Sequence, residues 1–236
     1  MKEEVRISGA IIRRLPRYYR YLGELKQQGV LRISSGELSE IMGVTASQIR
    51  QDLNHFGGFG QQGFGYKVDF LYEEIGKILG VDETNHLIIV GAGHLGTAMA
   101  VYSGGKMPGF ILDAVFDVDP ERIGEKIGER EVLDFNGIED YLKEHPAALA
   151  ALMVPHEEAE ACALRLVNAG VKGIWNFSHA DLRLPAGVAV ENVHMVESLM
   201  SLTYSVKTAG KKRTKKKKKE QNAEAVTEKD PVQEKM

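Results

Sequence analysis

The stretch Leu87-Ile-Ile-Val-Gly-Ala-Gly-His-Leu-Gly96 decides the fold class of this chain. Its apolar start, Leu87–Val90, predicts a strand, and Thr97–Val101 predicts a helix directly after the glycines. In a G-x-G-x-x-G sequence of this kind the first glycine permits a tight turn, the second lets a pyrophosphate approach the backbone, and the third lets the helix pack on the strand. The start of the helix offers free N–H groups to the phosphates. The predicted cofactor contacts here are Gly91, Ala92, Gly93, His94, Leu95 and Gly96.

A carboxylate follows this motif at the end of the next apolar run, Ala114–Asp117. Asp117 comes about twenty residues after Gly96, where such folds bind the ribose hydroxyls. A 2′-phosphate would meet like charge there, so NAD(H) is favoured over NADP(H), and a coenzyme A-binding domain of the same type is disfavoured. The alternative is a glycine turn beside a surface aspartate that binds nothing.

Short apolar runs alternate with amphipathic segments between residues 85 and 190. This alternation indicates βαβ units around a mainly parallel sheet, and hence an α/β fold. A further amphipathic helix is predicted over residues 192–207, with Val193, Val196, Leu199, Met200 and Thr203 at helical spacing. The predicted strands are Leu87–Gly91, Leu112–Asp117, Leu149–Pro155 and Val171–Phe177.

The amino-terminal part has the pattern of a helix–turn–helix. Ser34-Ser-Gly-Glu37 is a capping box that opens a short helix, and Gly43-Val44 makes the turn. We expect Leu38, Ile41 and Met42 to face inward from this helix.

A second capping box, Thr45-Ala-Ser-Gln48, opens the next helix, over about residues 46–55. Ile49 and Leu53 are four residues apart and should face the core, which leaves polar side chains for a major groove. Ser47, Gln48 and Gln51 are the candidates for direct reading of bases, because glutamine can bond bidentately to adenine, and Arg50 could contact a base or a phosphate. The predicted DNA contacts of this helix are Thr45, Ser47, Gln48, Arg50, Gln51 and Asn54.

Two short aromatic segments around a glycine-rich turn, Gly57–Tyr66, predict the wing of a winged helix. Its tip, Gln61-Gln62, could reach a minor groove or a phosphate. On the first helix Arg13, Arg14, Arg17 and Arg20 add positive charge, and Arg14 is a predicted phosphate contact. The alternative for these arginines is a solvated face.

Charge is distributed unevenly along the 236 residues, although the net charge is only −3. Residues 1–66 carry +3, residues 67–210 carry −11 and residues 211–236 carry +5. Only the first part therefore suits a polyanion such as DNA. The Lys-rich tail from Thr208 lacks apolar residues and is expected to be disordered, serving as a solubilising tail or as a non-specific phosphate-binding arm.

The single cysteine, Cys162, excludes an internal disulfide and a cysteine-only zinc site. Apolar neighbours on its helix favour a packing role over a thiol sensor. No apolar run approaches about 18 residues and Met1–Gly9 has no apolar signal core, so we expect a cytoplasmic protein that binds neither membrane nor metal.

Together these motifs resemble the Rex family of redox-sensing transcriptional repressors. The resemblance extends to about residue 207, and Thr45–Tyr66, Val90–Gly96, Phe116–Pro120, Gly173–Phe177 and Val190–Val193 carry it. It implies a homodimer with a swapped carboxy-terminal helix, and A·T-rich inverted-repeat operators near fermentation and respiration genes. It also implies that NADH releases the repressor and that NAD⁺ opposes release. The implied division is a winged helix (1–80), a Rossmann domain (81–191), a swapped helix (192–207) and a tail (208–236).

The resemblance further implies an interdomain switch at Arg20, Tyr102 and His194. The family usually has an aspartate at the third position, and a histidine cannot supply that charge. Either Tyr102 and hydrogen bonds suffice, or Glu191 or Glu197 replaces the acid. The family wing also often carries a basic residue where this chain has Gln62.

A nicotinamide pocket is expected at the carboxyl ends of the strands. An apolar pocket prefers the neutral reduced ring, because an unpaired cation is costly to desolvate. Met153 and the partner's Met195 are expected to line this pocket. The candidates beyond the glycine loop are Asp117, Val118, Val154, Pro155, Asn176, Phe177 and Met195.

An NAD-dependent dehydrogenase is the main alternative function. His156 could be imagined as its acid or base, with Lys172 or His179 as partners. Against it, no second substrate domain follows the Rossmann segment, and the sequence places no carboxylate to orient His156. We therefore expect a regulator without catalytic residues.

Overall fold

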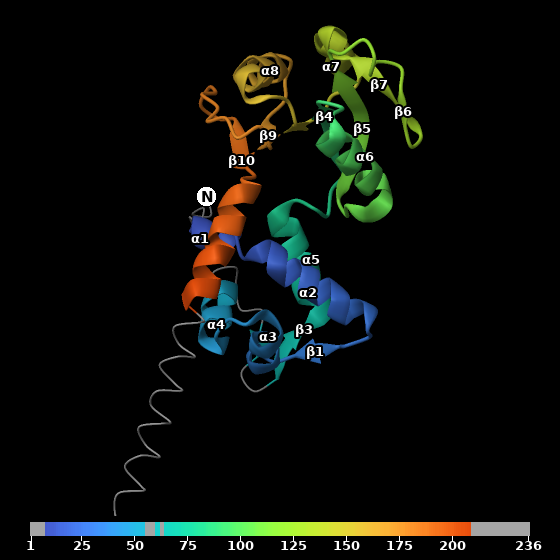
Figure 1. The fold of residues 1–236 in the computed structure, drawn as a ribbon. Helices are drawn as coiled ribbons and strands as arrows, with labels where there is room; N and C mark the ends of the chain where they lie inside the picture. Colours follow the sequence, from blue (N-terminus) through green and yellow to red (C-terminus); the bar gives the residue numbers. More distant parts are fainter. Residues whose placement is uncertain (1–7, 55–59, 62–63, 209–236) are drawn as a thin grey trace, which may run out of the picture.

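Two separate hydrophobic cores divide the chain into two units (Figure 1). The computed structural model describes residues 8–54, 60–61 and 64–208. The first core is built from buried side chains between Leu15 and Ile75, and the second lies on both faces of a sheet between Leu87 and Ala180. The arrangement confirms the predicted order of a winged helix followed by a Rossmann-like parallel sheet.

The first unit is a helix–turn–helix with a small antiparallel sheet in the order β1-β3-β2. In the wing, Gly60 pairs with Tyr66 and Gln61 with Gly65, as expected of a hairpin. The other half of the predicted tip, Gln62, lies outside the described residues. The helices are α1 (Gly9–Ile12), α2 (Leu15–Gln27), α3 (Ser35–Met42), α4 (Ala46–Asn54) and α5 (Val68–Leu79); the strands are β1 (Arg32–Ile33), β2 (Gly60–Gln61) and β3 (Gly65–Lys67).

Capping sets the limits of the two central helices. The Ser34–Glu37 capping box is present, with Glu37 N donating to Ser34 Oγ at 3.1 Å and Ser34 N to Glu37 Oε2 at 2.7 Å. Gly43, at φ +65°, ends α3 in the left-handed conformation that glycine tolerates best. The expectation that Ile41 faces inward is wrong, since it is 41% exposed. Leu38 and Met42, one helical turn apart, form the inward stripe, and Ile41 lies beside it.

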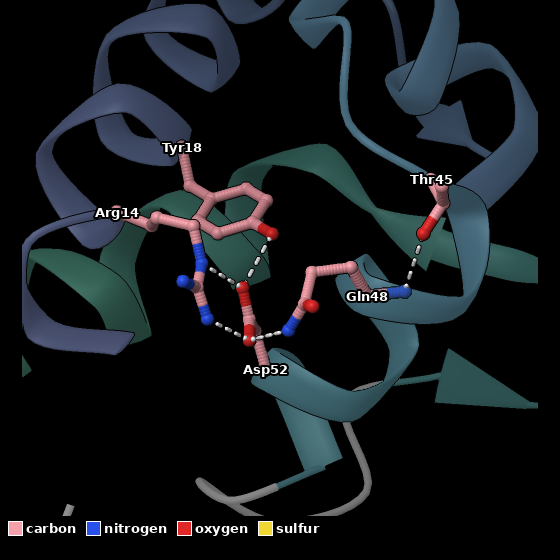
Figure 2. A network of polar contacts seen from close by, with 5 residues as sticks. All are labelled: Arg14, Tyr18, Thr45, Gln48 and Asp52. Atoms are coloured by element: carbon pink, nitrogen blue, oxygen red, sulfur yellow. Dashed lines mark hydrogen bonds and ion pairs between the residues drawn. The ribbon is translucent and has the colours of Figure 1, made fainter. Parts of the chain in front are cut away.

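Only one of the two hydrogen bonds of the second predicted capping box is present. Gln48 N donates to Thr45 Oγ1 at 3.2 Å, but the Gln48 side chain turns to Asp52 instead of returning to the cap. Asp52 is completely buried on α4 and lies against α2 (Figure 2). The arginine fork of Arg14 donates to both carboxylate oxygens, from Nε to Oδ2 at 2.7 Å and from Nη2 to Oδ1 at 2.6 Å. Tyr18 Oη also donates to Oδ2, at 2.9 Å.

These donors decide the charge of Asp52. Burial alone would raise the pKa of this carboxyl, but the hydrogen bonds from Arg14, Gln48 and Tyr18 outweigh it and hold the pKa below its usual value. Burial and the Asp52 contact raise the pKa of Tyr18, which therefore stays a hydrogen-bond donor. An ionised, fully bonded carboxylate thus joins α2 to α4.

The second unit is a seven-stranded sheet in the order β10-β9-β8-β4-β5-β7-β6, parallel except for the β6–β7 pair. The four predicted strands are present with somewhat different ends, whereas β6, β7 and β10 were not foreseen. The strands are β4 (Asn85–Val90), β5 (Phe110–Asp117), β6 (Lys126–Ile127), β7 (Arg130–Asp134), β8 (Leu149–Leu152), β9 (Gly173–Asn176) and β10 (Ala189–Asn192). The helices are α6 (His94–Lys106), the 3-10 turn η1 (Phe135–Gly137), α7 (Ile138–Glu144) and α8 (His156–Asn168).

Successive side chains of β4 pack on opposite faces of the sheet. Ile88 and Val90 belong to the core under α7 and α8, while Leu87 and Ile89 belong to the core under α6 (Figure 1). On the α6 side, an apolar hollow of about 420 Å³ remains over the β8–β10 part of the sheet. It is lined by Leu87, Met107, Phe110, Leu149, Gly173, Ile174, Trp175, Ala189, Val190 and Glu191.

The last described helix, residues 195–208, leaves the sheet after β10 and is the orange-red helix of Figure 1. It begins three residues later than predicted, because Asn192 still pairs with Asn176 in the sheet. Its spacing puts Met195, Leu199, Leu202 and Val206 on one face, and these side chains are 53–65% exposed. An apolar stripe of this size in water indicates an interaction surface. Among the described residues, none of the helices has the length and apolar character needed to cross a membrane.

We expect Arg14→Met to lower the free energy of unfolding of the first unit by about 3 kcal/mol, because it leaves the Asp52 carboxylate buried without its cation. Urea denaturation followed by circular dichroism measures this. The matched control is Arg13→Met, which changes an exposed side chain and should cost less than about 0.5 kcal/mol. Fluorescence of Trp175 reports the second unit and should not change. Equal stability of the two variants would contradict the role given to the Arg14–Asp52 pair.

Candidate dinucleotide site and nucleic-acid interface

The glycine loop between β4 and α6 has the geometry that the motif predicts. Gly91 has φ +103°, and a Cβ on it would strike the carbonyl oxygen of Met153. A Cβ on Gly96 would strike the carbonyl oxygen of Gly91, so the start of α6 packs directly on the turn. Gly93 differs, because a Cβ there would meet nothing within 4 Å. Gly91 and Gly96 therefore shape the loop, and Gly93 leaves open space in front of it.

Asp117 at the end of β5 is bonded to the same loop. Its Oδ2 accepts from Ala92 N at 2.6 Å, and its Oδ1 accepts from Val118 N at 2.7 Å and Asp119 N at 3.0 Å. The side chain is partly exposed, and a carboxylate has about four acceptor positions, so one remains for a hydroxyl donor. The backbone thus fixes an acceptor beside the open space at Gly93.

A cavity of about 440 Å³ lies between this loop and the amino end of α8. Its volume is within the usual range for ligand pockets. Val118, Val154 and Pro155 line it and were candidates from sequence, whereas Val90, Phe135, Glu158 and Cys162 were not. Glu158 and Cys162 are four residues apart on the helix that begins after Pro155, just beyond the carboxyl end of a strand. This spacing could have indicated both residues as cavity lining. The lining is Val90, Gly91, Gly93, Asp117, Val118, Phe135, Met153, Val154, Pro155, Glu158 and Cys162.

The other predicted cofactor residues lie elsewhere. His94 and Leu95 are exposed at the first turn of α6. Asn176 is 1% exposed, and its Nδ2 donates to Ala180 O and Asn192 Oδ1, both at 2.8 Å. Phe177 is nearly buried against Trp175. None of these four, nor Met195, is among the residues that line the 440 Å³ cavity.

Cys162 lines the cavity but packs against the core under α8. It is half-buried, and burial raises the pKa of its thiol. A thiol held in its protonated form is a poor nucleophile, which favours the packing role.

The polar face of α4 is exposed as predicted for Ser47, Arg50, Gln51 and Asn54. Arg50 Nη1 donates to Ser35 Oγ at 2.9 Å, which places its guanidinium beside α3. Thr45 is exposed and caps the helix, while Gln48 is half-buried because it bonds to Asp52.

Two arginines at the start of α2, the N-cap Arg14 and Arg17, are hydrogen-bonded inside the first unit. Arg14 was predicted to contact phosphate, but its guanidinium group donates two hydrogen bonds to Asp52. Arg17 Nη2 donates to the carbonyl oxygen of Met42 at 2.8 Å. Arg14 is therefore not available to a phosphate, whereas Arg17 keeps its full charge because its partner is a neutral carbonyl.

The predicted switch residues have other neighbours in a single chain. Arg20 pairs with Glu24 at 3.6 Å and lines a cavity of about 590 Å³ between the two units, together with Tyr19, Tyr72, Val81 and Phe110. Tyr102 is 54% exposed on α6. His194 Nδ1 lies 3.3 Å from Nδ1 of His179, which has φ +61°. The carboxylate beside Arg20 is thus Glu24, which the sequence analysis did not consider.

No cluster of three or more metal-ligating side chains occurs in residues 8–54, 60–61 and 64–208. The arrangement presents a fixed carboxylate near the amino end of α6 and, in the first unit, an exposed polar helix.

Comparison with known proteins covers both units. A family model described as the N-terminus of putative DNA-binding proteins matches residues 6–54, and one described as a CoA binding domain matches residues 82–180. The chain is 54% identical over 201 residues to a redox-sensing transcriptional repressor Rex from Clostridioides difficile, covering 85% of this chain and 96% of that protein. It is 52% identical over 204 residues to the Rex repressor of Thermoanaerobacter pseudethanolicus, covering 86% and 91%.

Solved structures of a Rex-family repressor called RSP also match. The complex of RSP with NAD⁺ and operator DNA superimposes with a TM-score of 0.81 at 50% identity, covering 89% of this chain and 97% of that chain. The complex of RSP with NADH gives 0.80 at 47% identity, covering 89% and 98%.

We expect Gly96→Ala to destabilise the second unit by about 1–3 kcal/mol, because the new methyl group overlaps the Gly91 carbonyl oxygen. Denaturation followed by Trp175 fluorescence measures it. Gly93→Ala is the matched control. Its φ of −64° suits alanine and its Cβ meets open space, so stability should change by less than about 1 kcal/mol. A stable Gly96→Ala protein would show that α6 does not depend on this contact.

Proposed function

The chain belongs to the Rex family of redox-sensing transcriptional repressors, and from this we propose a function for each of its two units. The winged helix holds operator DNA, and NADH in the glycine-loop site releases it while NAD⁺ opposes release. The carrying observation is the Asp117 carboxylate, fixed by Ala92 N at the glycine loop of a chain that also presents an exposed polar helix. The regulated genes follow from the family: those of fermentation and respiration, through A·T-rich inverted repeats.

The residues of the site fit NAD(H). Gly93 leaves room for a pyrophosphate at the amino end of α6, and Asp117 keeps an acceptor for a ribose hydroxyl. Coenzyme A carries a phosphate on its ribose, which the Asp117 charge would repel, so the fit favours NAD(H) within this type of domain. We propose contacts from the glycine loop, Asp117, Val118, Val154 and Pro155 for the adenosine and pyrophosphate.

The redox signal is a change in charge. The oxidised nicotinamide ring is cationic and the reduced ring is neutral, so an apolar pocket favours NADH. We keep Phe177 and the partner's Met195 as proposed neighbours of the ring. Asn176 would act through the backbone at the end of β9, since its side-chain amide is already bonded. Reversing occupancy from 99:1 to 1:99 requires about 5.5 kcal/mol of differential binding, which a dimer divides between two sites.

We propose a homodimer in which helix 195–208 docks on a second copy. Its apolar stripe is exposed in one chain, and the sheet has an open apolar hollow of about 420 Å³ on its α6 side. Both surfaces would be covered in a dimer. Arg20, Tyr102 and His194 would then face one another across subunits, with Glu24 as the acid in place of the family's aspartate.

We propose that residues 1–80 bind DNA, 81–191 bind NAD(H), 192–207 swap and 208–236 form a tail, in a cytoplasmic protein. Thr45, Ser47, Arg50, Gln51 and Asn54 remain proposed DNA contacts, with Gln61 and Gln62 of the wing. Arg14 becomes a support of the recognition helix α4. His156 is exposed at the first residue of α8, and within the described chain no carboxylate is hydrogen-bonded to it, so nothing favours the dehydrogenase alternative.

We expect NADH, but not NADPH, to release the full chain from an A·T-rich inverted repeat in a gel shift, with NAD⁺ opposing release. In Gly93→Ala the new methyl group occupies the space for the pyrophosphate. The NADH concentration that releases DNA should therefore rise at least about tenfold, while operator affinity without cofactor is unchanged. Release of the variant at the original NADH concentration would refute the cofactor site.

We expect Leu199→Glu with Leu202→Glu to turn the dimer into monomers and to abolish operator binding, because the charges fall on the apolar stripe. Sedimentation analysis measures this. Ser201→Glu places a single such charge on the opposite face of the helix and should leave the dimer intact. A dimer that survives the double change would place the interface elsewhere.

A further inference from the structure

The cavity beside the glycine loop has a second carboxylate that the proposed function does not use. Glu158, in the first turn of α8, lines this cavity together with Asp117. We propose that the Glu158 carboxylate accepts a hydrogen bond from the N6 amino group of the adenine ring of NAD(H). Glu158 then selects adenine against purines that carry an oxygen or a hydrogen at this position. The inference rests on the proposed binding of NAD(H) and adds the residue that recognises the base.

The order of the strands assigns the adenine half of the cofactor to this cavity. Asp117 ends β5 and is the proposed acceptor for the ribose to which the adenine is joined. The cavity extends from there to η1, which follows β7, and to the start of α8. The proposed neighbours of the nicotinamide ring, Asn176 and Phe177, lie at the end of β9, two strands from β4 on the side away from β5. With the pyrophosphate at the glycine loop, the two rings therefore fall on opposite sides of β4.

The lining of the cavity suits a flat base. Most of its side chains are apolar and can pack on the faces of a ring, and Val118 exposes 60% of its surface there. A pocket with apolar walls takes its specificity from the few polar groups among them. Here those polar side chains are Asp117, Glu158 and Cys162, and the apolar ones are Val90, Val118, Phe135, Met153, Val154 and Pro155.

Among the three polar side chains, Glu158 has the free acceptor oxygens. Three backbone N–H groups already bond to Asp117, and its remaining position is assigned to the ribose. Burial and the charge of Glu158 raise the pKa of the Cys162 thiol, so this side chain keeps its proton and is only a weak donor. Within the described residues no hydrogen bond or salt bridge involves the Glu158 carboxylate.

The local sequence explains why this carboxylate is free. A glutamate three residues after the N-cap of a helix commonly bonds back to the N–H of the N-cap residue. The N-cap of α8 is Pro155, which has no N–H, so Glu158 has no such bond to make. Its side chain is left to the cavity that it lines.

The chemistry of the carboxylate then decides which base fits. A carboxylate only accepts hydrogen bonds, so the base must supply the donor. Adenine carries two N–H donors at N6, and a hydrogen bond to a charged group is stronger than one between neutral groups. Hypoxanthine has a carbonyl oxygen in the same place, which would meet the carboxylate as one acceptor against another. A base without the amino group is therefore bound less well.

The test measures dissociation constants of the full chain by isothermal titration calorimetry. The probes are NADH and the reduced forms of nicotinamide hypoxanthine dinucleotide and nicotinamide purine dinucleotide, in which an oxygen or a hydrogen replaces the N6 amino group. We expect both analogues to bind about five- to tenfold more weakly than NADH. Because hypoxanthine also gains a proton at N1, the purine analogue decides. If it binds within twofold of NADH, the inference is overturned, whereas a wild type that binds no NADH refutes the proposed function and the inference with it.

Glu158→Gln tests the residue itself. The amide keeps the shape of the side chain but can both donate and accept, so it can bond to adenine N6 or to the oxygen of hypoxanthine. We expect the dissociation constants for NADH and the hypoxanthine analogue to come within twofold of each other. A variant that keeps the discrimination of the wild type overturns the role of Glu158.

Glu157→Gln is the matched control. Glu157 lies in the same turn of α8, is exposed and does not line the cavity. Both substitutions remove one negative charge near the positive end of the helix, so any general effect of charge on the cofactor should be the same in the two variants. We expect Glu157→Gln to discriminate between NADH and the hypoxanthine analogue as the wild type does. Equal loss of discrimination in both variants indicates an effect of net charge and overturns the inference.

Discussion

A buried negative charge is the constraint on which the first unit depends. Asp52 has no access to water, so its charge is tolerated only because protein donors replace the lost hydration. Those donors come from α2, 34 and 38 residues away in sequence, and from the neighbouring turn of α4. Helix α4 is therefore held against α2, and apolar packing by Ile49 and Leu53 completes the contact. Satisfied polar groups fix a unique arrangement in a way that apolar packing alone does not.

The second unit depends on a steric constraint instead. The start of α6 can approach the β4 turn only because Gly96 has no side chain. Asp117 in turn bonds to Ala92 in the same loop, so strand β5 and the turn support each other. Local sequence sets this geometry, which explains why it can be recognised in a single chain.

Prediction from sequence succeeded where the cause is local. The glycine loop, the Ser34–Glu37 capping box, the wing hairpin and the apolar pattern of each single strand all depend on residues close together in the chain. It failed where the cause is tertiary. Arg14 appeared to be a free cation because its partner lies 38 residues away, and Asn176 appeared to be available because its partner Asn192 comes from a strand that was not foreseen. Phe135, Glu158 and Cys162 line the same cavity although they come from η1 and α8, which are distant from the glycine loop in sequence.

Helix α2 extends from the cavity between the two units to the buried carboxylate of Asp52 on α4. Arg20 lines the cavity between the units, and Arg14 and Tyr18, less than two turns earlier, hold the recognition helix. With 13 residues α2 is a rod about 20 Å long. Because Asp52 joins α4 to this rod, a tilt of α2 at the cavity would also move the exposed polar face of α4.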